Sequence, residues 1–365
     1  MYKRQEIDFL PIGEESKSGD AVTIRMGNLN GRRDEYVIIV VDGGYQSDGE
    51  KVVDHINNYY NPHGRVDLVL STHGDQDHIG GLPTVMSSFD VGQLWMHLPW
   101  KHSQEIGSMF SNGRLIEKNL SSHVKALLEN AKGLEDIARQ KGVPIFEPFS
   151  DTSDCNSYEG LRILGPSTTY YEELLPSFRE FKETAPASVM GSLIEASGHM
   201  MTKALEAVHI ETLKDPADDA TTAENNSSAI LLITFQGEDI LLTADAGVPA
   251  LTQAVGVAEM FSHDLKYASL QQIPHHGSKR NMGPTLLDRM VGLRGSAPAK
   301  TIVVSAAKKG EPKHPSAKVT NAYKRRSGKV FTTQGSSFCF KRGITPSRGG
   351  YGPATEYPWK PEGDE

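Results

Sequence analysis

Cysteine is scarce in this sequence, and long apolar runs are absent from it. Only Cys155 and Cys339 are present among the 365 residues, and two thiols so far apart in sequence form no disulfide framework. No apolar run approaches the roughly 18 residues that a membrane-spanning helix needs. The first residues, MYKRQEIDFLPIG, lack the apolar core of a signal peptide. We therefore expect a cytoplasmic protein that does not enter the membrane.

An overall positive charge is also lacking, since the formal net charge is −8. The distribution is uneven, however: the segment from Arg294 to Arg348 contains 13 basic residues and one acidic residue, Glu311. This segment carries +12, so the rest of the chain carries −20. Such a segment is either a surface that binds a polyanion or a solvated basic face balanced by acidic loops, and charge alone does not decide between them.

Apolar β-branched runs alternate with helical periodicities along the chain. The runs predict buried strands at residues 35–44, 66–72, 93–98, 143–149, 161–166, 228–235, 239–245, 270–274 and 301–306. The periodicities predict helices at residues 49–60, 82–89, 104–141, 248–261, 284–293 and 315–326. Two hairpins are expected, one joining 228–235 to 239–245 and one within 329–342. The alternation predicts a layered α/β protein with mixed sheets.

Side chains that bind metal ions gather at the ends of four predicted strands. They are His73, Asp75, Asp77 and His78 after strand 66–72, Asp245 after LLTA, His275 and His276 after LQQIP, and Asn225 and Asn226 before strand 228–235. Loops at one edge of a sheet converge in space. Buried carboxylates are unfavourable unless they are paired or coordinated. The pattern therefore predicts a metal site at a sheet edge.

These motifs resemble those of the metallo-β-lactamase superfamily, whose His-x-His-x-Asp-His signature is matched here with Asp75 in place of the second histidine. They are more similar still to the metallo-β-lactamase-like domain of bacterial competence DNA-uptake channels, the ComEC type. The matching motifs are THGDQDHIGG, Gly19-Asp20-Ala21, Asp42-Gly43-Gly44, Asn225-Asn226-x-Ser228, Leu241-Leu242-Thr243-x-Asp245, His275 to Lys279, and His314-Pro315. The channel's membrane segments are absent, and the histidine of the superfamily's third ligand motif is missing near Asn226.

The resemblance implies a hydrolase domain over residues 1–342 with an αββα sandwich of two mixed sheets flanked by helices. It also implies two divalent ions, Zn²⁺ or Mn²⁺. The first ion would be held by His73 and Asp75, the second by Asp77, His78 and His275, with Asp245 as the bridge. Asn226, His276 and Asp20 are candidates either for a metal ligand or for a residue that orients one, and the same alternative applies to Asp75. Because the set is rich in oxygen, Mn²⁺ is expected to compete well with Zn²⁺.

Other positions are candidates for catalysis and substrate binding. Asp77 is expected to orient the attacking water, and His314 either serves proton transfer or substrate binding or is an ordinary loop histidine. Ser278, Lys279 and Lys313 are candidates for substrate contacts. The remaining histidines outside these motifs, among them His97 and His123, are expected to be structural or at the surface.

Residues 170–222 predict a mostly helical insertion, which would serve as a lid or as a surface for a protein partner, and residues 343–365 predict an irregular tail. The oligomeric state stays open.

Three functions fit these features. The first is a phosphodiesterase or nuclease that cleaves DNA or RNA with a metal-activated hydroxide. The second is a hydrolase of a small ester, lactone, amide or nucleotide, and the third is a non-catalytic binding module of the same fold.

Overall fold

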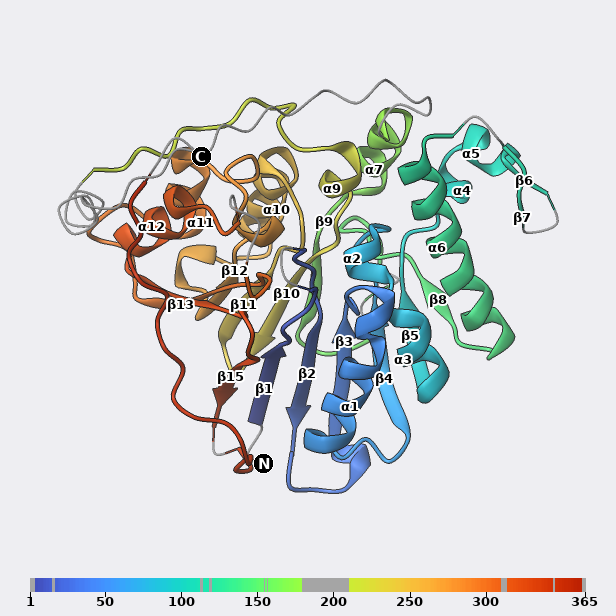
Figure 1. The fold of residues 1–365 in the computed structure, drawn as a ribbon, viewed down its shortest axis with the longest axis horizontal. Coiled ribbons are helices and arrows are strands. Elements are labelled where there is room, and N and C mark those ends of the chain that lie inside the picture. Colours follow the sequence, from blue (N-terminus) through green and yellow to red (C-terminus); the bar gives the residue numbers. More distant parts are fainter. Residues whose placement is uncertain are drawn as a thin grey trace.

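Two mixed β-sheets form the centre of the molecule in the computed structural model, which describes residues 4–14, 17–111, 114–117, 120–153, 155, 157–178, 210–309, 314–343 and 345–362 (Figure 1). The first sheet has the strand order β15-β1-β2-β3-β4-β5-β8 and the second β14-β13-β12-β11-β10-β9. The strands of the first sheet are β1 (Arg4–Phe9), β2 (Val22–Gly27), β3 (Tyr36–Val41), β4 (Arg65–Leu70), β5 (Asp90–Trp95), β8 (Ile145–Phe146) and β15 (Phe338–Arg342). Those of the second are β9 (Leu161–Gly165), β10 (Ile230–Phe235), β11 (Glu238–Leu242), β12 (Leu270–Gln272), β13 (Lys300–Val304) and β14 (Gly328–Thr332).

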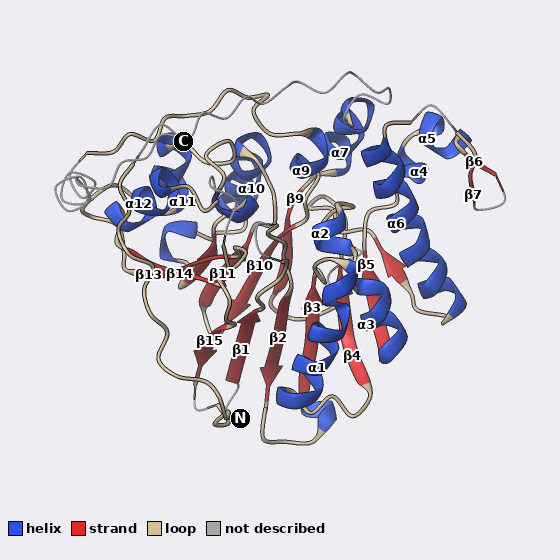
Figure 2. Cartoon of the chain, in the orientation of Figure 1, coloured by secondary structure: helices blue, strands red, loops and turns tan. Residues whose placement is uncertain are grey.

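Helices cover the outer face of each sheet (Figures 1 and 2). Those beside the first sheet are α1 (Gly49–Tyr59), α2 (Gln76–Ile79), α3 (Leu82–Ser88), α4 (Pro99–His102), α5 (Gln104–Ser108) and α6 (Ser122–Gln140). The others are α7 (Thr168–Leu174), α9 (Ala223–Asn226), α10 (Val248–Met260), α11 (Pro284–Met290) and α12 (Ala317–Arg325). This arrangement confirms the predicted α/β fold of two mixed sheets flanked by helices.

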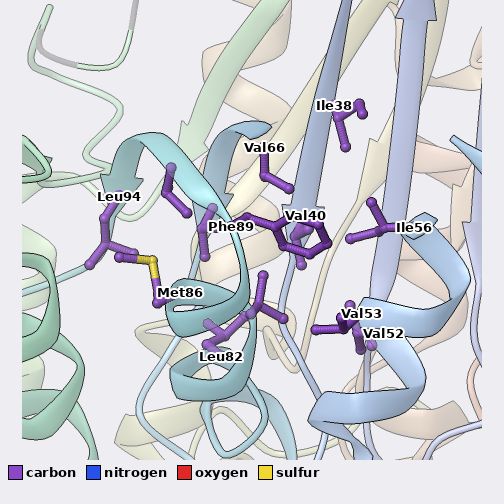
Figure 3. Packing of buried hydrophobic residues seen from close by; sticks show 14 of the residues in the cluster. Ile38, Val40, Val52, Val53, Ile56, Val66, Leu82, Met86, Phe89 and Leu94 are labelled. Atoms are coloured by element: carbon purple, nitrogen blue, oxygen red, sulfur yellow. The ribbon is translucent and has the colours of Figure 1, made fainter. Parts of the chain in front are cut away.

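The apolar core has layers between the two sheets and between each sheet and its helices. Val52, Val53 and Ile56 of α1 pack with Leu82 and Met86 of α3 against Ile38 and Val40 of β3 (Figure 3). A second layer lies between the two sheets and includes Ile39, Leu68, Leu231 and Val303. A third lies between the second sheet and α10, α11 and α12. Because β3 and β4 are covered on both faces, they read in the sequence as continuous apolar runs.

Two predictions of secondary structure are wrong. The periodic region 104–141 is not one helix: α5 ends at Ser108, a small hairpin of β6 (Phe110–Ser111) and β7 (Arg114–Leu115) follows, and α6 begins at Ser122. Residues 329–342 are not a hairpin, because β14 pairs with β13 in the second sheet and β15 pairs with β1 in the first. The chain crosses between the sheets in that connection, and the stacked rings of Phe331 and Phe338 lie 4.8 Å apart there.

The insertion and the tail lie only partly within the described residues. Residues 179–209 of the predicted 170–222 insertion lie outside them, and the described parts are α7, a 3₁₀ turn at Leu175–Ser177 and an extended segment at 210–222. Residues 345–362 of the tail form no helix or strand, and Arg348 anchors them. Its guanidinium lies 2.8 Å from Asp8 and 2.7 Å from Glu6, both buried on β1.

None of the helices within the described ranges is long and apolar enough to cross a membrane.

Candidate metal centre

The parallel strands of both sheets end at one edge of the sandwich. In the first sheet β3, β4 and β5 run parallel, and in the second sheet β11, β12 and β13 do so. Asp42 follows β3 and His73 follows β4, while Asp245 follows β11 and His276 follows β12. Since the carboxyl ends of parallel strands share an edge, four segments distant in sequence place ligand-type side chains together.

The loop after β4 turns sharply into α2. Asp75 is the residue before that helix, and its carbonyl accepts hydrogen bonds from the backbone N–H groups of His78 and Ile79 at 3.0 Å. Gly81 lies against Gly43, so closely that a β-carbon on Gly81 would come within 2.1 Å of the Gly43 carbonyl oxygen. The Gly-Gly pair at the end of THGDQDHIGG therefore lets the loop pack against the loop after β3, which fixes His78 beside Asp42.

Asp42 orients His78. It adopts a left-handed backbone conformation with φ of 57°. Its carboxylate accepts hydrogen bonds from the backbone N–H of Thr72 at 2.8 Å and from the Thr72 hydroxyl at 2.6 Å. It also accepts the Nδ1–H of His78 at 2.7 Å. With Nδ1 fixed as the donor, Nε2 of His78 faces the site with its lone pair, 3.3 Å from Oδ1 of Asp245.

His276 is held in the same way from the second sheet. Its Nδ1–H donates to the carbonyl oxygen of Ser305, at the end of β13, over 3.2 Å. Its Nε2 then faces Asp77 at 3.5 Å and Asp245 at 3.9 Å. The neighbouring His275 donates from Nδ1 to Oδ1 of Asn281 at 2.9 Å, and its Nε2 lies 3.5 Å from the other oxygen of Asp245.

Three overlapping groups of these residues have ligand atoms close enough together to hold a metal ion. They are His73 with His78 and Asp245, Asp77 with His78 and His276, and Asp20 with Asp245 and His276. Within each group the ligand atoms all lie within 4.8 Å of one another. The Nε2 atoms of His73, His78 and His276 and Oδ1 of Asp245 are buried and make no hydrogen bond to any described residue. Buried polar atoms normally have partners, so this convergence fits a bound divalent cation.

The ionisable groups of the metal centre shift one another's pKa values. Burial lowers the pKa of His276, but Asp245, Asp77 and Asp20 outweigh it and raise that pKa to about 9. Burial also opposes the charged form of Asp245, yet His275, His78 and His276 hold its pKa well below the usual range. Burial raises the pKa of Asp20. In the absence of a metal ion His276 therefore holds a proton, which a cation would have to displace, whereas burial lowers the pKa of His73.

The structure separates the predicted ligands into three sets. His73, Asp77, His78 and Asp245 lie together in the groups described above. The sequence analysis named His275 as a metal ligand and His276 only as a candidate. In the structure His276 belongs to two of those groups, while His275 belongs to none. The reason is local: both residues have left-handed backbone conformations, and this tight turn directs His276 inward to Asp77 and leaves His275 at the rim beside Asn281. Asp75 lies 3.9 Å from His73 but outside the three groups.

The remaining predicted residues differ in their surroundings. Asp20 joins one of the groups and accepts a hydrogen bond from Gln272 at 3.1 Å. Asn226 uses its carbonyl oxygen to accept the backbone N–H of Gly247 and its amide to donate to Thr221, so it fixes the loop after β11. Ser278 is buried and accepts the backbone N–H of Arg280, and Lys279 is half-buried beside it.

His314 was a candidate for proton transfer or substrate binding, and Lys313 was a candidate for a substrate contact. The ring of His314 stacks on His275 with centroids 6.1 Å apart, which places it at the rim of the site. Lys313 lies outside the described residues.

Two residues near the site were not among the sequence-based candidates for it. Asp42 was noted only for its Asp-Gly-Gly turn, although an aspartate at the end of a buried strand is itself a signal. His123 on α6 was expected to be structural or exposed, but its Nε2 lies 3.2 Å from Asp75. No spacing in the sequence could have found it, because α6 is far from every motif.

Comparison with known proteins places the first part of this site in a family. Residues 33–167, which include the whole of THGDQDHIGG, match the model of the metallo-β-lactamase superfamily. This segment of the chain is thus similar to the metallo-β-lactamase superfamily. Hydrolase chemistry at divalent metal ions is typical of that superfamily, and the His and Asp groups described above agree with it. The finer resemblance to the ComEC type stays a prediction.

Solved structures are similar to this chain at low sequence identity and with low TM-scores. The hydrolase AbOPH of the β-lactamase superfamily matches with 9% identity and a TM-score of 0.28, over 62% of this chain and 56% of its own. The E377D mutant of CmlA β-hydroxylase matches with 12% identity and a TM-score of 0.42, over 93% and 54%. Unliganded yeast PDE1 matches with 8% identity and a TM-score of 0.42, over 89% and 96%. The chain thus spans little more than half of the first two. No curated protein matches it.

Proposed function

We propose that the protein is a metal-dependent phosphodiesterase that cleaves DNA or RNA at a dinuclear site. The observation that carries this proposal is the position of Asp245. One of its oxygens faces His78 at 3.3 Å and His276 at 3.9 Å, and the other faces His275 at 3.5 Å. Oδ1 of Asp245 thus lies between His78, which shares a group with His73, and His276, which shares one with Asp20. A carboxylate in this position suits a bridge between two cations, and two such cations suit the displacement at a phosphoryl group.

The protein's own residues supply binding, orientation and proton transfer. His73, His78 and Asp245 would hold one ion and Asp77, Asp245 and His276 the other; when bound, the ions would lower the pKa of water and offset phosphate charge. Asp77 is the most accessible carboxylate of the three groups, with 24% of its side chain exposed. Its carboxylate can therefore reach both the ion site and an entering water molecule, and would orient that water.

The leaving oxygen requires a proton donor on the other side of the substrate. His314 lies at the rim against His275, and its imidazole can deliver a proton to a leaving group that enters from solvent. Lys279 and Arg280 follow the His275-His276 turn and are accessible to solvent, so they can contact the phosphates on either side of the scissile bond.

The oxygen-rich composition of the site supports Mn²⁺ as its metal. Carboxylates of Asp20, Asp77 and Asp245 contribute to the three groups beside three imidazoles, and no cysteine takes part. Oxygen ligands favour harder cations than an all-imidazole or thiolate site does. The expected result is that added Mn²⁺ raises activity above that of protein loaded with zinc alone.

The basic segment supports the proposal less than its charge suggested. Five of its 13 basic side chains are buried in contacts within the protein: Lys300, Lys324, Arg325, Arg326 and Arg348. Arg326, for example, pairs with Glu211 and Asp288 at 2.6 and 2.8 Å. Exposed Lys308 and Lys309 follow β13, whose end also carries the carbonyl that holds His276. Phosphate contacts are therefore expected from a few lysines at the site edge, rather than from the whole segment.

Because these basic side chains are buried, the basic surface is smaller than the sequence suggested. This observation favours a second candidate function, the hydrolysis of a small ester, lactone, amide or nucleotide. Salt separates the two, because nucleic-acid binding weakens steeply as salt rises and turnover of a small neutral substrate does not. A non-catalytic binding module is the remaining alternative.

The test is a cleavage assay on single-stranded DNA, double-stranded DNA and RNA, each with Mn²⁺, Mg²⁺ and Zn²⁺. Asp77→Asn should abolish cleavage, while Asp136→Asn, at an exposed position on α6, is the matched control and should retain it. Absence of cleavage under every condition, with metal bound, would reject the nuclease and leave the small-molecule hydrolase or the binding module.

A further inference from the structure

A second set of ionisable side chains adjoins the metal centre on the side of α6. Nε2 of His123, in the first turn of that helix, lies 3.2 Å from Oδ1 of Asp75 and 3.9 Å from Oε1 of Glu224. The other oxygen of Asp75 lies 3.9 Å from Nε2 of His73. Three segments meet here: the loop after β4, the start of α6, and α9. Asp75 thus lies between the histidine of the first motif and a histidine that no motif contains.

The local structure holds this arrangement in place. Ser121 caps α6, because its hydroxyl accepts the backbone N–H of Val124 at 3.3 Å, and Val124 and Leu127 anchor the helix in an apolar cluster. Leu127 also packs against the loop itself, since a β-carbon on Gly74 would meet its side chain at 2.6 Å. The start of α6 is therefore fixed against the loop that carries His73 and Asp75.

Burial of these side chains points to a cation. The side chains of His73 and Glu224 are fully buried and that of Asp75 is 11% exposed. Nε2 of His73 points toward Asp75 and Asp245 and makes no hydrogen bond to any described residue. His73 shares the group with His78 and Asp245, but His78 and Asp245 also face the Asp77 side. An ion on the His73 side would thus have few ligands of its own from the motif residues.

We propose that His123 completes the metal site on the His73 side, together with Asp75 and with Glu224 as an additional oxygen donor. This inference rests on the proposed dinuclear function and names ligands for its first ion. His73, Asp75 and His123 are farther apart as a set than the three groups of the metal centre. The ring of His123 is 31% exposed, so it has room to rotate inward when the ion binds.

The competing explanation is that His123 merely forms an ion pair with Asp75. The two explanations differ in metal stoichiometry. As a ligand, His123 is needed for the first ion but not for the second, whereas as an ion-pair partner it can be removed with both ions retained.

The experiment counts ions bound to the full chain. Protein stripped with a chelator is titrated with MnCl₂ by calorimetry, and bound manganese is measured by mass spectrometry after dialysis. Wild type should bind two ions, and His123→Ala should bind one, with the first ion weakened at least tenfold. His263→Ala is the control, because His263 pairs with Asp239 away from the site, and it should bind two. Two ions of unchanged affinity in His123→Ala, or a single ion in wild type, would overturn the proposal.

A second measurement covers the case in which His123→Ala does not fold. Imidazole ¹⁵N spectra of folded wild type are recorded with and without Zn²⁺, and the His123 signals are assigned with His123→Gln. Direct ligation moves the Nε2 signal of His123 on zinc addition, and an unmoved signal would reject the proposal. Neither measurement uses a substrate. Loss of the first ion in His123→Ala without any phosphodiester cleavage by wild type would therefore reject the proposed function alone.

Discussion

Two clusters of buried ionisable side chains in this molecule balance their charges differently. In the Arg348 cluster (Glu6, Asp8, Arg25, Tyr60 and Arg348) each carboxylate meets a guanidinium of the protein itself. Arg25 lies 2.7 Å from Glu6, Arg348 lies 2.7 Å from Glu6 and 2.8 Å from Asp8, and the Tyr60 hydroxyl donates to Asp8 at 2.5 Å. In the metal centre no arginine or lysine pairs with a group member among the described residues, and several ligand atoms make no hydrogen bond.

This difference teaches how to recognise a functional site among buried charges. Both clusters are buried apart from Asp77, and the pKa of Asp8, like that of Asp245, is held well below its usual range in spite of burial. What differs is the source of positive charge. One cluster has the permanent guanidinium groups of Arg25 and Arg348 beside the imidazole of His55, which lies 3.4 Å from Asp8, whereas the other has titratable imidazoles alone. Imidazoles can release their protons to make room for a cation, and guanidinium groups cannot.

The largest expected effect comes from removing the guanidinium at the tail. Arg348→Met leaves Glu6 and Asp8 buried without the guanidinium that they share, and breaking a buried pair typically costs about 3–5 kcal/mol. Urea denaturation should show this loss, while manganese affinity stays at the wild-type value. The control is Arg32→Met, whose exposed pair with Asp34 should contribute less than about 1 kcal/mol. A similarly small loss for Arg348→Met would mean that the two clusters do not differ as described.

Removing the carboxylate of Asp245 should weaken metal binding strongly and change the stability of the metal-free protein less. Asp245→Asn should weaken manganese binding by more than about 100-fold, because loss of a residue that only supports a ligand already costs roughly 10–100-fold. Its metal-free unfolding free energy should change less than that of Arg348→Met, because the imidazoles can adjust by releasing protons. Calorimetric titration and urea denaturation measure the two quantities. Wild-type metal affinity in this variant would remove Asp245 from the ligand set.

A smaller effect is expected at the residue that orients His78. Asp42→Asn retains the size of the side chain but offers a single acceptor oxygen to Thr72 and His78. Manganese affinity should fall roughly 10–100-fold, and addition of metal should still raise the melting temperature. If Asp42→Asn bound manganese as tightly as wild type, the tautomer of His78 would be fixed by some other contact.

The smallest predicted effect concerns a buried histidine outside both clusters. Burial lowers the pKa of His97, stacked on Tyr171, to about 3. The unfolded chain, with a pKa near 6.5, therefore binds more protons between those values, and the stability from His97 falls as pH decreases through that window. Between pH 7 and pH 5.5 the loss should be about 1.3 kcal/mol. His97→Phe should reduce the acid loss by that amount in urea denaturation, and an unchanged acid dependence would contradict the prediction.

The sequence predicted most strands of the second sheet. It also predicted that the first motif brings His73, Asp77 and His78 together. Strands such as β3 and β10 are continuous apolar runs, so their periodicity is clear. The strands β1 and β2 were not predicted, because buried Gln5, Glu6, Asp8 and Arg25 make them look polar. Their partners are in the tail and on α1, so only the folded structure shows why these residues are buried.

The differences between the predicted and the observed surroundings of the site residues have the same origin. His276 replaced His275 as a group member because a left-handed turn, and not the order in sequence, sets their directions. The basic segment was an uninformative signal because pairing with Glu211, Asp288 and Glu362 can only be seen in three dimensions. Residues contributed by one loop are predictable from spacing, whereas contacts between segments distant in sequence are not.

The pairing of β15 with β1 also bears on how the protein is made. Gln5 lies opposite Arg342, so the edge of the first sheet is closed by the two most distant strands of the chain. During synthesis β1 therefore exposes an unpaired edge until residues 338–342 have left the ribosome. Contacts of such high sequence separation slow folding, and open strand edges favour association between chains. Newly made protein should therefore depend on chaperones up to the last stage of its synthesis.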